Sequence, residues 1–210
     1  MLAKMLLRKA AATGLVFVAS ATSNGETITI PSEAAIGDLA FLCDAAVSLS
    51  TDFYPSNVTP SGFTETTNSY YPGVYNTSVV SSRKKLVSGD PGATLTGMLG
   101  TVANYKTILI FRKSPVISTI TAYEAVSNAT VGNPAAQSKA TQTASYVVLG
   151  GCFGEAALPN WATVWYDASI TNGYQRVAYK IFNASPATVS VDSDDVGDAN
   201  FLLSCSIRTA

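Results

Sequence analysis

The chain has 210 residues, of which 47% are hydrophobic and only 13% are charged, and its formal net charge is −1. Globular proteins average about 25% charged residues, so Ser, Thr and Asn must cover much of this surface. Near-neutrality argues against general nucleic-acid binding, which requires many phosphates to be neutralised. The sequence has no histidine, which excludes Ser-His-Asp and Cys-His catalysis and His-ligated zinc or iron sites. A weakly charged, hydroxyl-rich surface favours packing against other protein.

The N-terminal segment resembles a signal peptide only loosely. A basic start precedes a short apolar run at residues 14–19, but three cationic residues interrupt the segment. We therefore expect residues 1–12 to form an arm or a short helix that docks on a neighbouring subunit, and residues 15–20 to form the first strand. No stretch approaches the roughly 18 apolar residues of a membrane span, so we expect no membrane partner.

Two kinds of apolar pattern predict strands. Segments that alternate polar and apolar residues predict half-buried strands with one face in water; they are residues 27–30, 176–181 and 188–192. Continuously apolar segments predict central strands covered on both faces; they are residues 39–43, 107–111, 146–149 and 201–205.

Frequent turn signals separate these strands, and no convincing helical pattern follows the first dozen residues. Asn172 and Gly173 predict a hairpin turn, because both residues tolerate positive φ. Many short strands with frequent turns predict an all-β fold, an antiparallel jelly-roll-like β-sandwich. We expect residues 1–20 to hold the arm and first strand and residues 21–210 to form a single sandwich domain. Residues 55–75 are predicted to form a surface excursion that carries contacts.

The sequence contains a weak internal echo. Residues 85–91 (KLVSGDP) resemble residues 180–186 (KIFNASP), and one or two small residues, then Thr and an apolar residue, follow in each case. Each copy then continues into an apolar strand that ends at an arginine, Arg112 or Arg208. We interpret the echo as two equivalent hairpins, one in each half of the sandwich, with chance similarity as the alternative.

The cysteines and acidic residues offer few sites. Three cysteines in apolar stretches, without CxxC spacing, predict reduced core thiols; they are Cys43, Cys152 and Cys205. A carboxylate cluster, which could bind Ca²⁺ but which we interpret as a solvated acidic turn, contains Asp192, Asp194, Asp195 and Asp198. An acid pair for glycoside hydrolysis could come from this cluster or from Glu124, Glu155 and Asp167. The sequence places no two of these acids across a cleft, so we expect no enzyme activity, no cofactor and no metal.

Aromatic and basic residues suggest contacts with partners. Flat rings stack on sugars and on proteins alike; the candidates are Tyr70, Tyr71, Tyr75, Trp161, Trp165 and Tyr166. For the two tryptophans we favour the core or a subunit interface. Two basic clusters, interpreted as solvated or partner-facing patches, are Lys4, Arg8 and Lys9, and Arg83, Lys84 and Lys85. Four glycosylation sequons, interpreted as chance occurrences, begin at Asn57, Asn76, Asn128 and Asn183.

Several segments resemble a β-rich structural domain of tailed-bacteriophage virion proteins. Residues 30–40 (IPSEAAIGDLA) are similar to the apolar-Pro…Gly-Asp-Leu start of that domain, and residues 59–63 (TPSGF) to the Pro-x-Gly-aromatic turn that follows it. The end of that domain is similar to residues 176–181, residues 185–186 and residues 201–208.

The resemblance covers about residues 25–210 and brings no catalytic residues with it. It implies a virion structural protein, assembled in the host cytoplasm, and we expect a capsid cement or decoration subunit. The implied partners are the major capsid protein or other virion proteins, and copies of the chain itself, with a trimer as our guess. The alternative is a head or tail fibre domain that binds host-surface glycans.

Overall fold

The structure is a computed structural model that describes residues 14–48, 59–71, 76–96, 98, 103–114, 119–128, 137–138, 146–153, 166–182, 188–189 and 199–208. Fourteen strands and no helix occur in these residues. The first half of the chain forms β1 (Gly14–Ser23), β2 (Ile28–Thr29), β3 (Leu39–Ser48), β4 (Thr64–Tyr71), β5 (Asn76–Lys85), β6 (Thr94–Leu95) and β7 (Ala103–Ser114). The second half forms β8 (Thr119–Asn128), β9 (Gln137–Ser138), β10 (Tyr146–Phe153), β11 (Ala168–Asn172), β12 (Gln175–Phe182), β13 (Thr188–Val189) and β14 (Ala199–Arg208).

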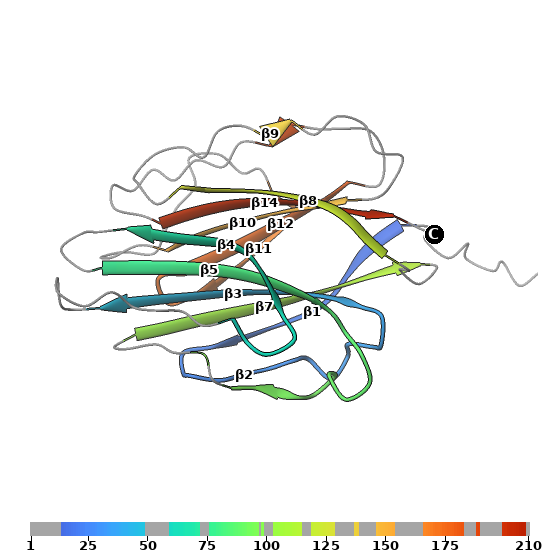
Figure 1. The fold of residues 1–210 in the computed structure, drawn as a ribbon, viewed down its shortest axis with the longest axis horizontal. Helices are drawn as coiled ribbons and strands as arrows, with labels where there is room; N and C mark the ends of the chain where they lie inside the picture. The colour runs from blue at the N-terminus through green and yellow to red at the C-terminus, as the bar shows by residue number, and fades with distance from the viewer. Residues whose placement is uncertain are drawn as a thin grey trace, which may run out of the picture.

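Ten of the strands form two five-stranded antiparallel sheets, which are stacked as two layers (Figure 1). The order is β1-β7-β3-β5-β4 in the first sheet and β11-β12-β10-β14-β8 in the second. The predicted all-β sandwich is therefore confirmed. A jelly roll in particular is not confirmed, because each large sheet takes all of its strands from one half of the chain.

The two halves of the chain repeat one arrangement of seven strands. In the first half β1 pairs with β7, β7 with β3, β3 with β5, β5 with β4, and the short β2 with β6. In the second half β8 pairs with β14, β14 with β10, β10 with β12, β12 with β11, and the short β9 with β13. The halves pack against each other through strands that are not equivalent: β4 contacts β8, and β1 contacts β12. Figure 1 shows β2 and β9 on opposite outer sides, as a two-fold relation between the halves requires.

A bulge recurs at the same place in both halves. The register of β1 against β7 shifts at Val18, and that of β8 against β14 shifts at Thr121. Two pairs beyond each shift, Val16 pairs with Arg112 and Thr119 pairs with Arg208. The two arginines that the sequence echo matched are therefore equivalent.

The lysines of the echo are not equivalent. In the first half Ala40 of β3 pairs with Lys84. The residue equivalent to Ala40 in the second half is Tyr146 of β10, which pairs with Phe182. Lys85 therefore corresponds to position 183, three residues after Lys180. The echo identified the correct pair of hairpins but placed them out of register.

The main core lies between the two sheets, because alternate residues of each strand face inward. Phe17 stacks on Tyr179 with ring centroids 4.9 Å apart, and Phe111 meets the same tyrosine edge-on at 5.1 Å. Burial of a side chain such as Phe111 contributes about 1.5–3 kcal/mol. The buried residues of this core are Leu15, Leu39, Phe41, Cys43, Ala45, Val79, Leu109, Phe111, Val177 and Tyr179.

A second core covers the outer face of the first sheet. The ribbon of β2 and β6 and the loop before β3 pack on this face; the buried residues are Ile28, Ile30, Ala34, Ala40, Leu42, Phe63, Leu86, Met98, Ile108 and Ile110. Residues 39–43 and 107–111 are thus buried on both faces, as their continuous apolar runs predict.

The predicted hairpin joins β11 to β12. Asn172 pairs with Gln175, so Gly173 and Tyr174 occupy the centre of the turn, one residue later than the sequence suggests. Gly173 has a φ of 59°, the left-handed conformation that such turns require. The predicted first strand, residues 15–20, lies within β1.

Candidate functional site

The Gly-Asp-Leu motif forms an internal clamp at one end of the sandwich. Arg112 donates through Nε to Asp38 Oδ1 at 2.8 Å and through Nη2 to Asp38 Oδ2 at 2.7 Å. The same carboxylate accepts from the backbone N–H of Ala35 at 2.8 Å, and its side chain is only 3% exposed. Hydrogen bonding to Asp38 raises the pKa of Arg112. The motif therefore fastens the loop before β3 to β7.

The Pro-Ser-Gly-Phe turn is also internal. The N–H of Phe63 donates to the carbonyl of Pro60 at 3.0 Å, and the Phe63 ring is buried in the second core. Lys84 Nζ lies 5.8 Å from the centre of that ring and forms an ion pair with Asp90 Oδ1 at 2.7 Å. The middle lysine of the 83–85 cluster is therefore engaged within the fold.

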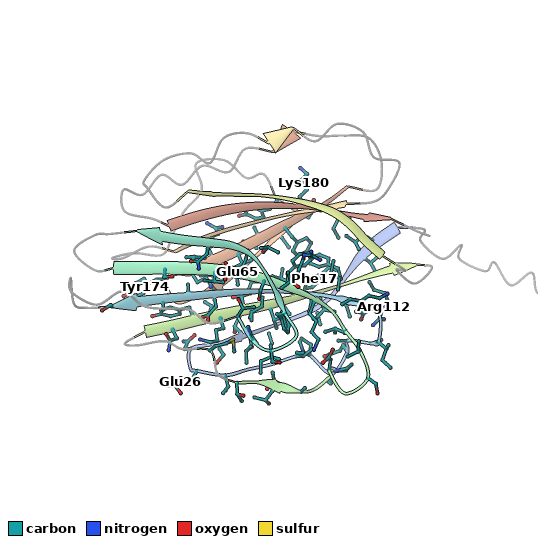
Figure 2. The ribbon with its side chains drawn as sticks, in the orientation of Figure 1. Phe17, Glu26, Glu65, Arg112, Tyr174 and Lys180 are labelled. Atoms are coloured by element: carbon teal, nitrogen blue, oxygen red, sulfur yellow. The ribbon has the colours of Figure 1, made fainter. Side chains whose placement is uncertain are left out.

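A buried polar network lies at the opposite end of the sandwich, which carries Tyr174 (Figure 2). Gln175 of β12 is 1% exposed and connects the two sheets. Its Nε2 donates to the carbonyls of Tyr105 at 3.0 Å and Cys43 at 3.3 Å, and its Oε1 accepts from the Thr107 hydroxyl at 2.6 Å. The sequence shows only a polar residue at the start of a strand, so it gives no sign of this network.

The β11–β12 hairpin docks on the first sheet beside this network. Asn172 Nδ2 donates to the carbonyls of Ser23 at 3.0 Å and Lys106 at 3.1 Å. The α-carbon of Gly173 lies so close to Tyr105 that a β-carbon there would overlap the ring. The turn therefore holds the second half of the chain against the first.

A pair of oppositely charged residues is buried on the outer face of the first sheet. Asp44 of β3 and Lys106 of β7 are directly opposed across the two strands, and Lys106 Nζ lies 3.1 Å from Asp44 Oδ1. The two side chains are 4% and 0% exposed, respectively. Loss of solvation raises the pKa of Asp44 to about 6, against the opposing attraction of Lys106.

A buried amide side chain lies two residues before Lys106 in β7. On the same face Asn104 is 8% exposed, and its Oδ1 is buried without a hydrogen-bond partner in this part of the chain. An amine and a carboxyl group in such surroundings can exchange a proton or condense.

The predicted acidic candidates do not form a site among the described residues. Asp167 precedes β11, and its carboxylate accepts from the N–H of Ile181 at 2.8 Å. Glu124 lies opposite Ser204 in the β8–β14 pairing. The remaining acids, Glu155, Asp192, Asp194, Asp195 and Asp198, lie outside the described residues. Within the described parts of the chain, no three His, Cys, Asp or Glu residues gather as metal ligands do.

The aromatic candidates are only partly described. The Tyr166 hydroxyl accepts from Arg176 Nη2 at 2.7 Å. Tyr70 and Tyr71 lie in β4, while Tyr75, Trp161 and Trp165 lie outside the described residues. Also outside them are Lys4, Arg8, Lys9, Asn57, Asn183 and the arm at residues 1–12.

The remaining candidates lie in strands. Cys43 is a free, buried thiol, and its burial together with nearby Asp44 raises its pKa well above the ordinary value. Cys152 and Cys205 lie in β10 and β14, and Asn76 and Asn128 lie at the ends of β5 and β8. Among the described residues, no helix is long and apolar enough to cross a membrane.

Comparison with known proteins finds no match to a family model, a curated protein or a solved structure. The resemblance to phage virion domains therefore stays a prediction, based on the residues that the sequence shares with them.

Proposed function

We propose that the chain is a virion structural protein, a capsid cement or decoration subunit that acts by packing against other protein. The observation that carries this proposal is the edge strand β1. It spans ten residues without a single charge and pairs on one side only among the described strands. Edge strands of proteins that stay monomeric are commonly protected by charged residues or proline.

The side chains of β1 support the same proposal. Val16 is 38% exposed, and the hydroxyl-bearing Ser20 and Thr22 are also exposed. An edge strand with small uncharged side chains can accept a strand from another molecule. The chain's low overall charge offers little repulsion to such association.

A second exposed apolar feature lies at the Arg112 end of the sandwich. Ile36 is 64% exposed and Val87 is 55% exposed. Their loops adjoin, because the N–H of Gly37 donates to the carbonyl of Leu86 at 2.8 Å. This pair, the Ile36–Val87 patch, is a candidate contact with the major capsid protein. The arm at residues 1–12 is proposed to clamp a neighbouring subunit, and the trimer stays our guess for the oligomer.

The test places positive charge on β1 and removes the exposed apolar side chains of the Ile36–Val87 patch. Ser20→Lys with Thr22→Lys should reduce self-association in light scattering, and Ile36→Ser with Val87→Ser should reduce co-sedimentation with particles. Ser61→Lys, at an exposed turn residue, is the matched control and should change neither. A wild-type chain that is monomeric and never co-sediments with particles would overturn the proposal. Glycan binding that is lost in Tyr70→Ala and Tyr71→Ala would support the fibre alternative instead.

A further inference from the structure

Asp44 and Lys106 are placed close enough to react with each other. They face each other from neighbouring strands, with Nζ 3.1 Å from Oδ1 and almost no exposure to solvent. Burial removes the hydration of both charges, and attraction compensates only when geometry is excellent and further hydrogen bonds are present. At Asp44 the loss of solvation outweighs the attraction of Lys106 and raises the pKa of the carboxyl group. The neutral form of Asp44 is therefore favoured more than it would be in water.

We propose that Asp44 and Lys106 condense spontaneously to form an isopeptide bond that links β3 to β7. A proton passes from the ammonium group to the carboxylate, which leaves a neutral amine beside a neutral carboxylic acid. The amine nitrogen attacks Cγ of Asp44, and the new C–N bond forms as one C–O bond breaks. The departing hydroxyl takes a proton from the nitrogen and leaves as water. The step is a condensation without net oxidation or reduction, and it needs no other reactant.

The surroundings suit the product better than the ions. A secondary amide carries no charge, so condensation removes two buried charges at once. The amide needs partners for its N–H and C=O groups, and Asn104 offers a buried acceptor, Oδ1, two residues before Lys106 on the same face of β7. Exclusion of water also disfavours hydrolysis of the bond once it has formed. The two strands are central in the first sheet, so the crosslink would hold the middle of that sheet together.

Intact-mass spectrometry of the purified, denatured full chain tests the proposal directly. The wild-type chain should be lighter than its sequence by the mass of one water. Trypsin should release residues 10–83 joined to residues 86–112, with Lys106 uncleaved, because the nearest cleavage sites are Lys9, Arg83, Lys85 and Arg112. Fragmentation of that species should locate the link at Asp44 and Lys106.

Two variants separate this bond from any other dehydration. Lys106→Arg keeps a cation but offers no comparable nucleophile, so the chain should regain its full sequence mass. Asp44→Asn can still react through its side-chain amide, and should then lose the mass of one ammonia. A loss of water that persists in Lys106→Arg would overturn the proposal. So would a wild-type chain of full mass whose Lys106 is cleaved normally by trypsin, and this result does not depend on the folding of any variant.

Discussion

Arg112 and Arg208 occupy equivalent positions in the two halves of the chain, each opposite an edge-strand residue just beyond a bulge. The equivalence extends to the pairing of all seven strands in each half. A duplicated unit explains why each large sheet is built from one contiguous half. The duplication also explains how the two halves pack together, since two copies of one unit can bury the same apolar face against each other.

The Asp38–Arg112 clamp should contribute measurably to stability. In Arg112→Ala the Asp38 carboxylate would stay buried with its two guanidinium hydrogen bonds lost. We expect the free energy of unfolding to fall by about 1–3 kcal/mol, since Arg112 is itself partly exposed and partly screened. Urea denaturation measures the change. Arg112→Lys keeps the charge but not the paired geometry, so its free energy of unfolding should fall by less. An unchanged urea midpoint for Arg112→Ala would show that the clamp does not stabilise the fold.

Gly173→Ala should destabilise the chain for two separable reasons. The residue has positive φ, which costs about 1 kcal/mol for alanine, and its β-carbon would overlap the Tyr105 ring. We expect the free energy of unfolding, measured by urea denaturation, to fall by about 2–4 kcal/mol in total. In a Tyr105→Ala background the same substitution should cost only the backbone part. Equal costs in both backgrounds would mean that the ring moves aside freely.

Much of the fold could be predicted from the sequence, because strand patterns depend on local alternation. The run at residues 107–111 identified a strand buried on both faces, and the positive φ that Gly173 allows identified the hairpin, although its centre lies one residue later than predicted. The duplication was predictable only as a weak echo. The register between the two copies could not be predicted, because pairing across the sheet determines it. Lys85 and Lys180 lie opposite residues that are not equivalent in the two halves.

The sequence could not predict which polar side chains come together in the fold. Asp44 and Lys106 are 62 residues apart in the sequence, and only the antiparallel pairing of β3 with β7 places them opposite each other. Gln175 lies in a different half from the three residues it bonds. Motifs such as Gly-Asp-Leu were visible in the sequence, but their role in fixing loops depends on a partner, Arg112, in a distant strand.

Gln175 is expected to be the most sensitive residue between the sheets. Gln175→Leu introduces an apolar side chain of similar size and removes the partner of the buried Thr107 hydroxyl and of two backbone carbonyls. Leaving such groups unsatisfied costs about 1–3 kcal/mol each in the worst case. We expect a loss of about 2–4 kcal/mol in the free energy of unfolding. Thr107→Val in the Gln175→Leu background should restore part of it, because the hydroxyl that lacks a partner is then absent.

The buried carboxyl of Asp44 should make stability depend on pH once Lys106 is replaced. In Lys106→Met no amide can form, and the amine that lowers the pKa of Asp44 is gone, so this pKa should rise above its value of about 6. The ordinary value is 3.8, so the folded state binds the proton more tightly than the unfolded state does. The resulting stabilisation is fully present below pH 3.8 and is lost as the pH rises through the folded-state pKa.

The contribution of Asp44 to the stability of Lys106→Met should therefore be greatest near pH 4 and fall by about 3 kcal/mol by pH 8, since each pKa unit corresponds to about 1.4 kcal/mol. Urea denaturation at a series of pH values measures this slope. The matched control is Asp44→Asn with Lys106→Met, which has the same packing without the titrating group and should lack this component. Identical pH profiles for the two variants would mean that Asp44 has an ordinary pKa and is hydrated in the folded chain. A steeper loss in the single variant would establish that the site is dry enough to disfavour charge, which is the condition that condensation with Lys106 requires.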